Sequence, residues 1–238
     1  AENMLAGMSR VPIPDAADPE FSVWQEEQIE RLKETVSPQD IVCTTASTVA
    51  DTVYELKSAD WTVLVSQHGP ENADTKRAML IVADEGIQQM NILIRKKTAA
   101  GRQVLAFDPI YMGGNQPEKR LAMAFEAAGV HLLGVQAGQI MGVCQWARKE
   151  LGVAQIELCC SGWNASTAAL IAAALMNAKD ETISRVMLHN APDSLEALIS
   201  KPVKYTEKPA LFCYGLLPDF DMDVLQILCH GIIIDSGQ

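Results

Sequence analysis

One short stretch of the chain combines a hydroxyl, two thiols and a sharp turn. A strand-like run at residues 155–160 leads through CCSGWNAS, residues 159–166, into an alanine-rich helix. This order predicts a strand, a tight turn and a closely packed helix, where a nucleophile can stand if its neighbours two places away are small. Ser161 has the hydroxyl nearest the turn. It is therefore the candidate nucleophile, with attack on an acyl carbon as the expected chemistry.

The sequence fits three alignments of this turn, which differ in the residue at the tip. Counting back from the helix gives Trp163, counting forward from the strand gives Gly162, and the hydroxyl criterion gives Ser161. Trp163 would crowd a turn with Ser161 at its tip, and Leu158 would crowd one with Cys160 there. Two outcomes stay open: Ser161 is a nucleophile, or the turn keeps its shape without its chemistry.

The other members of a hydrolytic triad are incomplete. Asp235 follows the strand-like residues 232–234 and is the candidate acid. His230 precedes that strand and would lie roughly 13 to 17 Å from Asp235, at the opposite end. His189 ends a strand on the correct edge, but it comes before the acid in the chain. The sequence therefore predicts either a site that has lost its base or a histidine beyond Gln238.

No metal or cofactor is expected. The four histidines have no metal-ligand spacing, and no C-x-x-C occurs. Asp219, Asp221 and Asp223 alternate, but the glycine and closing glutamate of a calcium loop are missing, so a helix-entry segment is predicted. The glycine pair at 113–114 lacks a phosphate-binding fingerprint.

Charge and hydropathy exclude two classes of partner. The chain carries 19 basic and 30 acidic residues, for a net charge of −11. No cluster of Lys and Arg could bind a phosphate backbone, so nucleic acid is not expected. The most apolar segment, residues 130–144, contains polar side chains and is too short to cross a bilayer of roughly 30 Å. A membrane is therefore not an expected partner either.

The six cysteines and the first residue leave the compartment open. The adjacent Cys159 and Cys160 lie in an apolar strand, and three other cysteines lie in apolar stretches, so buried thiols are predicted and not a disulfide framework. A chain starting at Ala1 fits an exported protein after signal removal, and equally a trimmed cytoplasmic one.

The order of elements predicts an α/β fold. Residues 1–40 are expected to form an arm and a helix at 22–36, with Ser22 as N-cap and Gln25 in a capping box. Residues 41–238 are expected to form the main domain, with antiparallel strands at its N-terminal edge. Continuous apolar runs then predict buried parallel strands with helices on both faces. These runs are residues 78–83, 103–107, 156–160, 185–188 and 232–234.

Three glycines at spacing four form one face of the helix predicted at 131–150. They are Gly134, Gly138 and Gly142. This spacing lets another backbone approach closely. We expect the partner to be the central sheet or a neighbouring helix.

A family resemblance follows from these segments. Residues 78–86, residues 104–109 with the following glycine pair, the turn, and residues 215–221 together resemble the acetyl xylan esterase and dienelactone hydrolase branch of the α/β hydrolases. The resemblance covers residues 60–238 and rests on order and local pattern. The G-x-S-x-G signature is absent, which makes this a degenerate form of the family's nucleophile elbow.

The resemblance implies further site residues. Glu85 or Gly86 would supply one oxyanion-hole amide, and Gly162 would supply the other if Ser161 is the nucleophile. The implied ligand is a small ester or a carbohydrate ester, and the chain could act as a homo-oligomer or beside a partner chain. The favoured expectation is a hydrolase-like domain with an incomplete triad, low or absent activity and a binding or assembly role. The alternative is an active serine esterase of the acetyl esterase type, whose histidine lies outside this chain.

Overall fold

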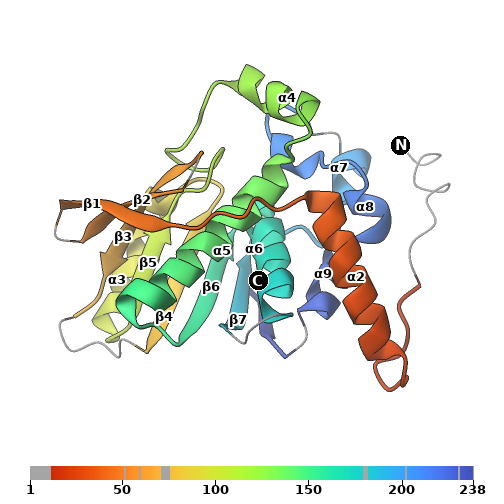
Figure 1. Cartoon of the computed structure of the whole chain (residues 1–238), viewed down its shortest axis with the longest axis horizontal. Helices are drawn as coiled ribbons and strands as arrows, with labels where there is room; N and C mark the ends of the chain where they lie inside the picture. The colour runs from red at the N-terminus through yellow and green to blue at the C-terminus, as the bar shows by residue number, and fades with distance from the viewer. Residues whose placement is uncertain are drawn as a thin grey trace.

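A twisted sheet forms the centre of the molecule (Figure 1). The computed structural model describes residues 12–50, 52–58, 60–70, 76–178, 182–201, 203–229 and 231–237. In these ranges the strands are β1 (Thr44–Ala50), β2 (Val53–Lys57), β3 (Thr62–His68), β4 (Arg77–Ala83), β5 (Gln103–Phe107), β6 (Gln155–Ser161), β7 (Ile183–His189) and β8 (Ile233–Gly237). They lie in the order β1-β2-β3-β5-β4-β6-β7-β8.

The pairing confirms the predicted fold class. β1, β2, β3 and β5 pair antiparallel in that order, at the N-terminal edge. From β5 onward through β4, β6, β7 and β8 all pairs are parallel. The apolar runs form these parallel strands because a strand buried on both faces needs no polar alternation. The carboxyl ends of β4, β6 and β7 therefore meet at one edge of the sheet.

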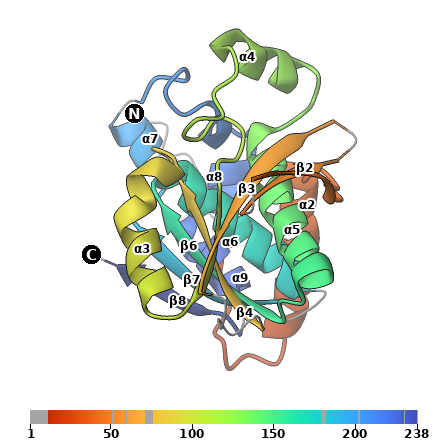
Figure 2. The ribbon, with the colours of Figure 1, turned by 90° about the vertical axis from the view of Figure 1, so that its left-hand side faces the viewer.

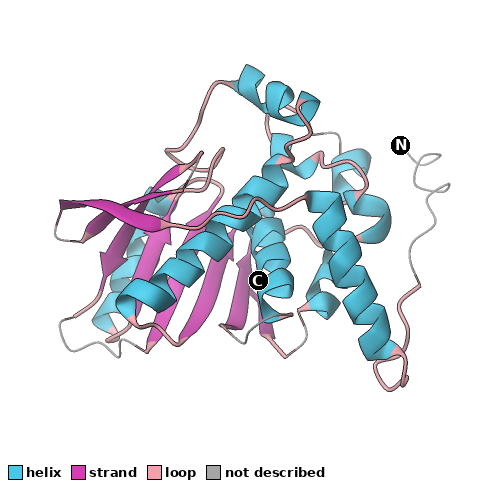
Figure 3. Cartoon of the chain, viewed as in Figure 1, coloured by secondary structure: helices cyan, strands magenta, loops and turns pink. Residues whose placement is uncertain are grey.

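Helices cover both faces unequally. The longer helices are α2 (Phe21–Val36), α3 (Asn91–Ala99), α4 (Lys119–Ala127), α5 (Leu132–Leu151), α6 (Trp163–Asn177) and α9 (Met222–Leu228). Short turns of helix are η1 (Ile87–Met90), α7 (Ala197–Ser200), η2 (Pro209–Leu211) and α8 (Leu216–Asp219). Figure 2 shows α3 on one face and α5 and α6 on the other, with α4 beyond the end of the sheet. Figure 3 shows the same layers coloured as helix and strand.

The central helix α6 is buried from Asn164 to Met176. Its alanines, including Ala168 and Ala172, are fully buried. The helix contacts β6 and β7 below it and α5, α9 and α2 beside it. Small side chains make this possible because they let the helix axis lie close to several neighbours at once. The predicted close packing of this alanine-rich helix is confirmed.

The start of α2 corrects the predicted capping box. The helix begins at Phe21 and its N-cap is Glu20, so Ser22 lies inside the first turn. Gln25 does not reach back to the N-terminus. Its Nε2 donates instead to the carbonyl of Ile227, at 2.9 Å, and holds α2 to the end of α9. A tertiary contact has replaced the local one.

The glycine face of α5 packs against the end of α2 and the chain that follows it. A Cβ on Gly138 would stand 2.5 Å from the carbonyl oxygen of Gln39, and Gly134 and Gly142 face the same segment. This segment comprises Val36, the last residue of α2, and residues 37–43, which lead to β1. The expected neighbouring helix therefore contributes its last residue, opposite Gly134, and the chain after it lies opposite Gly138 and Gly142.

The helices of the described residues differ from membrane spans in length or in hydropathy. No single helix there is both long and apolar enough to cross a bilayer. Arg120–Ala127 and Leu132–Leu151 would together be long and apolar enough, but they are bent by 93° at the break between them.

The cysteines are free thiols, as predicted. Five of the six are buried and Cys43 is half-buried. Burial raises the pKa of Cys159 to about 11 and that of Cys229 to about 12. The pKa of Cys160 is raised well above its ordinary value, chiefly by burial. A buried, protonated thiol is a poor nucleophile, which disfavours Cys160 in that role.

Candidate active site at the strand-to-helix turn

The turn after β6 has Gly162 at its tip. β6 ends at Ser161, α6 begins at Trp163, and Gly162 alone lies between them. Its φ of 104° and ψ of 173° belong to a region that residues with a side chain rarely adopt. The predicted strand, sharp turn and helix are confirmed. Of the three alignments, the one counted forward from the strand describes this backbone.

Asp84 reaches this turn from the neighbouring strand. It directly follows β4, and its carboxylate accepts hydrogen bonds from two amides in the first turn of α6, those of Asn164 (3.2 Å) and Ala165 (2.8 Å). Its own amide donates to the carbonyl of Ser161, at 2.9 Å. A carboxylate suits this position because the amino end of a helix carries free N–H groups and partial positive charge. Asp84 therefore caps α6 from a remote part of the chain.

The same carboxylate fills the space in front of Gly162. A Cβ at Gly162 would lie 2.6 Å from the Cβ of Asp84 and 2.7 Å from its Oδ2. Real Cβ atoms essentially never come closer than 3.0 Å to such neighbours. A side chain at the tip is thus excluded while Asp84 stands there.

Lys208 supplies the counter-charge. Its Nζ lies 2.9 Å from Oδ2 of Asp84 and 5.8 Å from the centre of the Trp163 ring. The Asp84 side chain is 8% exposed and that of Lys208 is 26% exposed. A carboxylate this buried needs a partner, because burying an unpaired charge is costly. Lys208 also brings the segment at 206–209 against the turn.

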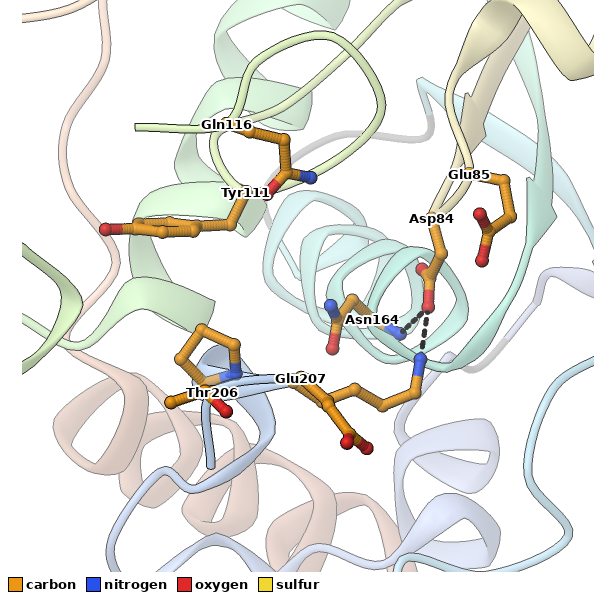
Figure 4. Close-up of a pocket in the computed structure, with 9 residues that line it drawn as sticks. Asp84, Glu85, Tyr111, Gln116, Asn164, Thr206 and Glu207 are labelled. Atoms are coloured by element: carbon orange, nitrogen blue, oxygen red, sulfur yellow. Dashed lines mark hydrogen bonds and ion pairs between the residues drawn. The ribbon is translucent and has the colours of Figure 1, made fainter. Parts of the chain in front are cut away.

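A polar pocket of about 180 Å³ opens beside this ion pair (Figure 4). Figure 4 shows Tyr111 and Gln116 on one side and Thr206 and Glu207 on the other, with Asn164 between them. The full lining is Asp84, Glu85, Tyr111, Gln116, Asn164, Thr206, Glu207, Lys208 and Pro209. Tyr111, Asn164 and Pro209 are buried, whereas Glu85 and Glu207 are exposed.

The side chain of Ser161 has a polar contact with the amide of Asn190. Ser161 is the last residue of β6 and half-buried. Its Oγ lies 3.4 Å from Nδ2 of Asn190. In the sheet Ser161 pairs with His189, whose carbonyl accepts a hydrogen bond from Gly162. His189 thus ends β7 on the expected edge, and its main chain supports the turn.

Two of the amides expected to form an oxyanion hole, those of Gly86 and Gly162, are already bonded. Gly86 donates its N–H to the carbonyl of Ala83, at 3.0 Å, and Gly162 donates to His189, at 2.9 Å. Glu85 is exposed and contributes its side chain to the pocket.

Asp235 lies away from the turn. β8 continues to Gly237, so Asp235 stands inside the strand and not after it, which corrects the predicted boundary. Across the sheet, Ser161 on β6 pairs with His189 on β7, and His189 pairs with Gly237 on β8. Asp235 precedes Gly237 by two residues and therefore lies roughly 7 Å back along β8 from this level. Its Oδ2 lies 3.3 Å from Arg185 Nη1, and both side chains are well exposed. The structure does not bring Asp235 and Ser161 together.

The remaining titratable candidates have structural partners. His131 is the N-cap residue of α5 and lies 3.0 Å from Glu126. Asp221 is the N-cap residue of α9 and accepts from the amide of Met222, which confirms the predicted helix entry. His230 lies outside the described residues. Within those residues, no group of three His, Cys, Asp or Glu side chains could hold a metal ion.

Three residues of the site escaped prediction: Asp84, Asn164 and Lys208. Asp84 had a usable signal, because an acid directly after a buried parallel strand lies at the edge where the turn was expected. Asn164 follows the tip by two residues, where a small residue was sought. Lys208 lies in an irregular segment without any periodic pattern, so only the three-dimensional structure places it.

Comparison with solved structures shows the α/β-hydrolase fold. A provisionally assigned acetyl xylan esterase from Bacteroides fragilis superposes with a TM-score of 0.69 at 13% identity, over 99% of this chain and 81% of that one. A glucuronoyl esterase from Solibacter usitatus gives a TM-score of 0.63 at 13% identity, over 94% and 75%. No protein-family model matches the sequence. No curated protein matches it either.

Proposed function

We propose that this chain is an α/β-hydrolase-like domain that no longer hydrolyses esters and uses the pocket beside its turn to bind a ligand. The proposal rests on the Asp84 carboxylate, which occupies the space where a nucleophile at the tip would project. The solved structures of similar fold include named esterases, which supports an ester hydrolase ancestry.

Electrostatics support the loss of catalysis. Acyl transfer needs N–H donors that are free to stabilise an oxyanion as it forms. Here the amides of Asn164 and Ala165 hold a permanent carboxylate, paired with Lys208. A second anion beside Asp84 would be repelled. The carboxylate of Asp84 therefore already occupies the amino-terminal end of α6, where an oxyanion would otherwise bind.

The alternative is an active esterase with Ser161 as nucleophile, Asp235 as acid and Glu85, Gly86 or Gly162 at the oxyanion. Ser161 would need a base beside it, and its described polar neighbour is the amide of Asn190. Asp235 is paired with Arg185 at another row of the sheet. Both observations favour the binding role.

Hydrolysis of a small acetyl ester tests the proposal. We expect the wild-type chain and Ser161→Ala to show the same rate, close to that of buffer containing an unrelated protein of similar lysine content. A working triad accelerates its reaction by several orders of magnitude, so a genuine activity could not be missed. Turnover that disappears in Ser161→Ala would refute the proposal and support the alternative.

A further inference from the structure

A second hollow lies at the amino-terminal ends of the parallel strands. It has a volume of about 200 Å³ and is lined by Arg77, Gln155, Glu157, Ser184, Arg185 and Ile233. The strand pairing places Arg77 beside Gln155 and Arg185 beside Glu157. Because β4 is 7 residues long, the hollow lies roughly 20 Å from the carboxyl-terminal edge of the sheet, where the turn after β6 stands. The proposed function therefore gives it no role.

The charges around this hollow leave a surplus of cations. Both carboxylates already have a partner: Glu157 lies 2.7 Å from Nη2 of Arg102, and Asp235 lies 3.3 Å from Nη1 of Arg185. Arg77 is exposed and has no ion-pair partner in the part of the chain that the structure describes. The hollow thus has a local positive charge, although the chain as a whole carries −11. A local positive potential attracts anions.

Lys97 adds a second cation next to this group. Burial raises the pKa of the Cys159 thiol, and the charge of Lys97 opposes that rise, which places Lys97 near Cys159. Cys159 follows Glu157 by two residues on β6, so both side chains lie on the same face of the sheet. Among the residues that the structure describes, Lys97 has no ion-pair partner either.

Arg185 is available to a ligand at little cost. Its contact with Asp235 is 3.3 Å long, and the two side chains are 40% and 49% exposed. Exposed ion pairs of this kind contribute little to stability. Arg185 is therefore free to turn from Asp235 to an anion in the hollow. Arg77 lines the same hollow, and the side-chain amide of Gln155 is a further hydrogen-bond donor there.

From these observations we propose that the hollow binds the phosphate group of a small molecule, as inorganic phosphate or as a phosphomonoester. Arg77 and Arg185 would donate hydrogen bonds to the phosphate oxygens, and Gln155 would donate another. A guanidinium suits this role because its planar fork of N–H groups matches two phosphate oxygens. A phosphomonoester carries a charge of roughly −1.5 to −2 at pH 7, which matches the two unpaired cations.

Three anions at matched ionic strength test the site. Inorganic phosphate and glycerol phosphate represent the two sources of the phosphate group, and acetate is a small monoanion. We expect NMR titration of the nitrogen-labelled protein to show saturable shifts at Arg77, Gln155 and Arg185 with inorganic phosphate, against a sodium chloride reference. Acetate should bind at least about tenfold more weakly, because it carries a single charge. Tighter binding of glycerol phosphate than of inorganic phosphate would identify a phosphomonoester as the ligand, and the reverse order the free ion.

Four substitutions locate the binding. Arg77→Gln and Arg185→Gln each remove one guanidinium and should weaken phosphate binding by about tenfold. Lys97→Gln removes a cation beside the hollow, and we expect it to weaken binding a few-fold and to reduce the salt dependence. Arg120→Gln is the matched control, because it removes an exposed arginine from α4, at the opposite end of the sheet (Figure 1), and should change nothing. Unfolding midpoints show whether each variant remains folded.

Several outcomes would overturn the phosphate site. They are the absence of saturable shifts with inorganic phosphate, acetate binding as tight as that of phosphate, and unchanged phosphate binding in both Arg77→Gln and Arg185→Gln. Shifts that sodium chloride reproduces at the same ionic strength would also overturn it, because they would report only screening of surface charge. None of these results bears on ester hydrolysis at Ser161, so the proposed function is tested separately.

Discussion

The carboxylate of Asp84 and the bare backbone of Gly162 occupy complementary positions at the turn. A Cβ at Gly162 would lie 2.7 Å from Oδ2 of Asp84, and the same carboxylate caps α6 from the loop after β4. The two residues therefore depend on each other. A side chain at the tip requires Asp84 to leave, and without Asp84 the first turn of α6 loses its cap.

This relationship predicts a coupled pair of mutations. Gly162→Ala should lower the free energy of unfolding by about 2 to 5 kcal/mol, because it adds a clash to an unfavourable backbone conformation. In the Asp84→Ala background the same change should cost less, since only the backbone strain remains. Chemical denaturation of the four proteins in this double-mutant cycle measures the difference.

Gly101→Ala is the control for that cycle. Gly101 has φ 79°, but a Cβ there would meet nothing within 4 Å. The loss in the free energy of unfolding caused by Gly101→Ala therefore reports backbone strain without a clash. This loss should be the same with and without Asp84. Equal costs of Gly162→Ala with and without Asp84 would show that the carboxylate does not fill the site.

The ion pair between Lys208 and Asp84 gives a second prediction. Lys208→Met keeps much of the apolar stem but leaves a nearly buried carboxylate without its cation. We expect a loss of about 1 to 3 kcal/mol in the free energy of unfolding. Lys33→Met removes the exposed partner of Glu30 and should cost under about 1 kcal/mol. Similar values for the two variants would mean that Lys208 is not needed to neutralise Asp84.

Sequence patterns were sufficient to predict the parallel strands of the sheet and the helices that cover it. Strands such as β5 are buried on both faces, so an uninterrupted apolar run marks them directly. The first and last residues of a helix or strand were harder to predict where a tertiary contact determines them. Gln25 fits a capping box by spacing, yet its amide bonds to the carbonyl of Ile227, far along the chain.

The site was only partly predictable from the sequence, because its chemistry depends on contacts between residues that are far apart in the chain. The turn at Gly162 was found from local pattern, but the three alignments could not be separated without its φ. The contact of Asp84 with the turn depends on the pairing of β4 with β6, which no local pattern specifies. Gly138 is a second example of a contact that the sequence could not identify. Its spacing predicted a close backbone neighbour, but only the structure shows that this neighbour lies in residues 36–43.

A third prediction concerns the packing of α6 on the sheet. Ala172 is fully buried, so Ala172→Leu should overpack the layer between helix and sheet and cost about 1 to 3 kcal/mol. Ser161→Ala removes a half-buried hydroxyl whose contact with Asn190 is long, and it should cost much less. Urea denaturation compares the two. A neutral Ala172→Leu would show that the helix does not lie close to its neighbours.

The last prediction follows from the buried thiols. Burial raises the pKa of Cys213 and Cys229 from 9.0 to about 12. Both stay protonated in the folded protein while the unfolded chain ionises near its ordinary value, so the folded state binds more protons between these limits. Their contribution to stability is thus complete below about pH 9 and is lost as the pH rises toward 12, by about 1.4 kcal/mol per pH unit for each thiol. Denaturation across this range should show that the free energy of unfolding declines less steeply in Cys213→Ala/Cys229→Ala than in the wild type. Lysine and tyrosine titration affects both proteins equally, so it cancels in the comparison. Parallel declines in the two proteins would mean that these thiols ionise as readily in the fold as outside it.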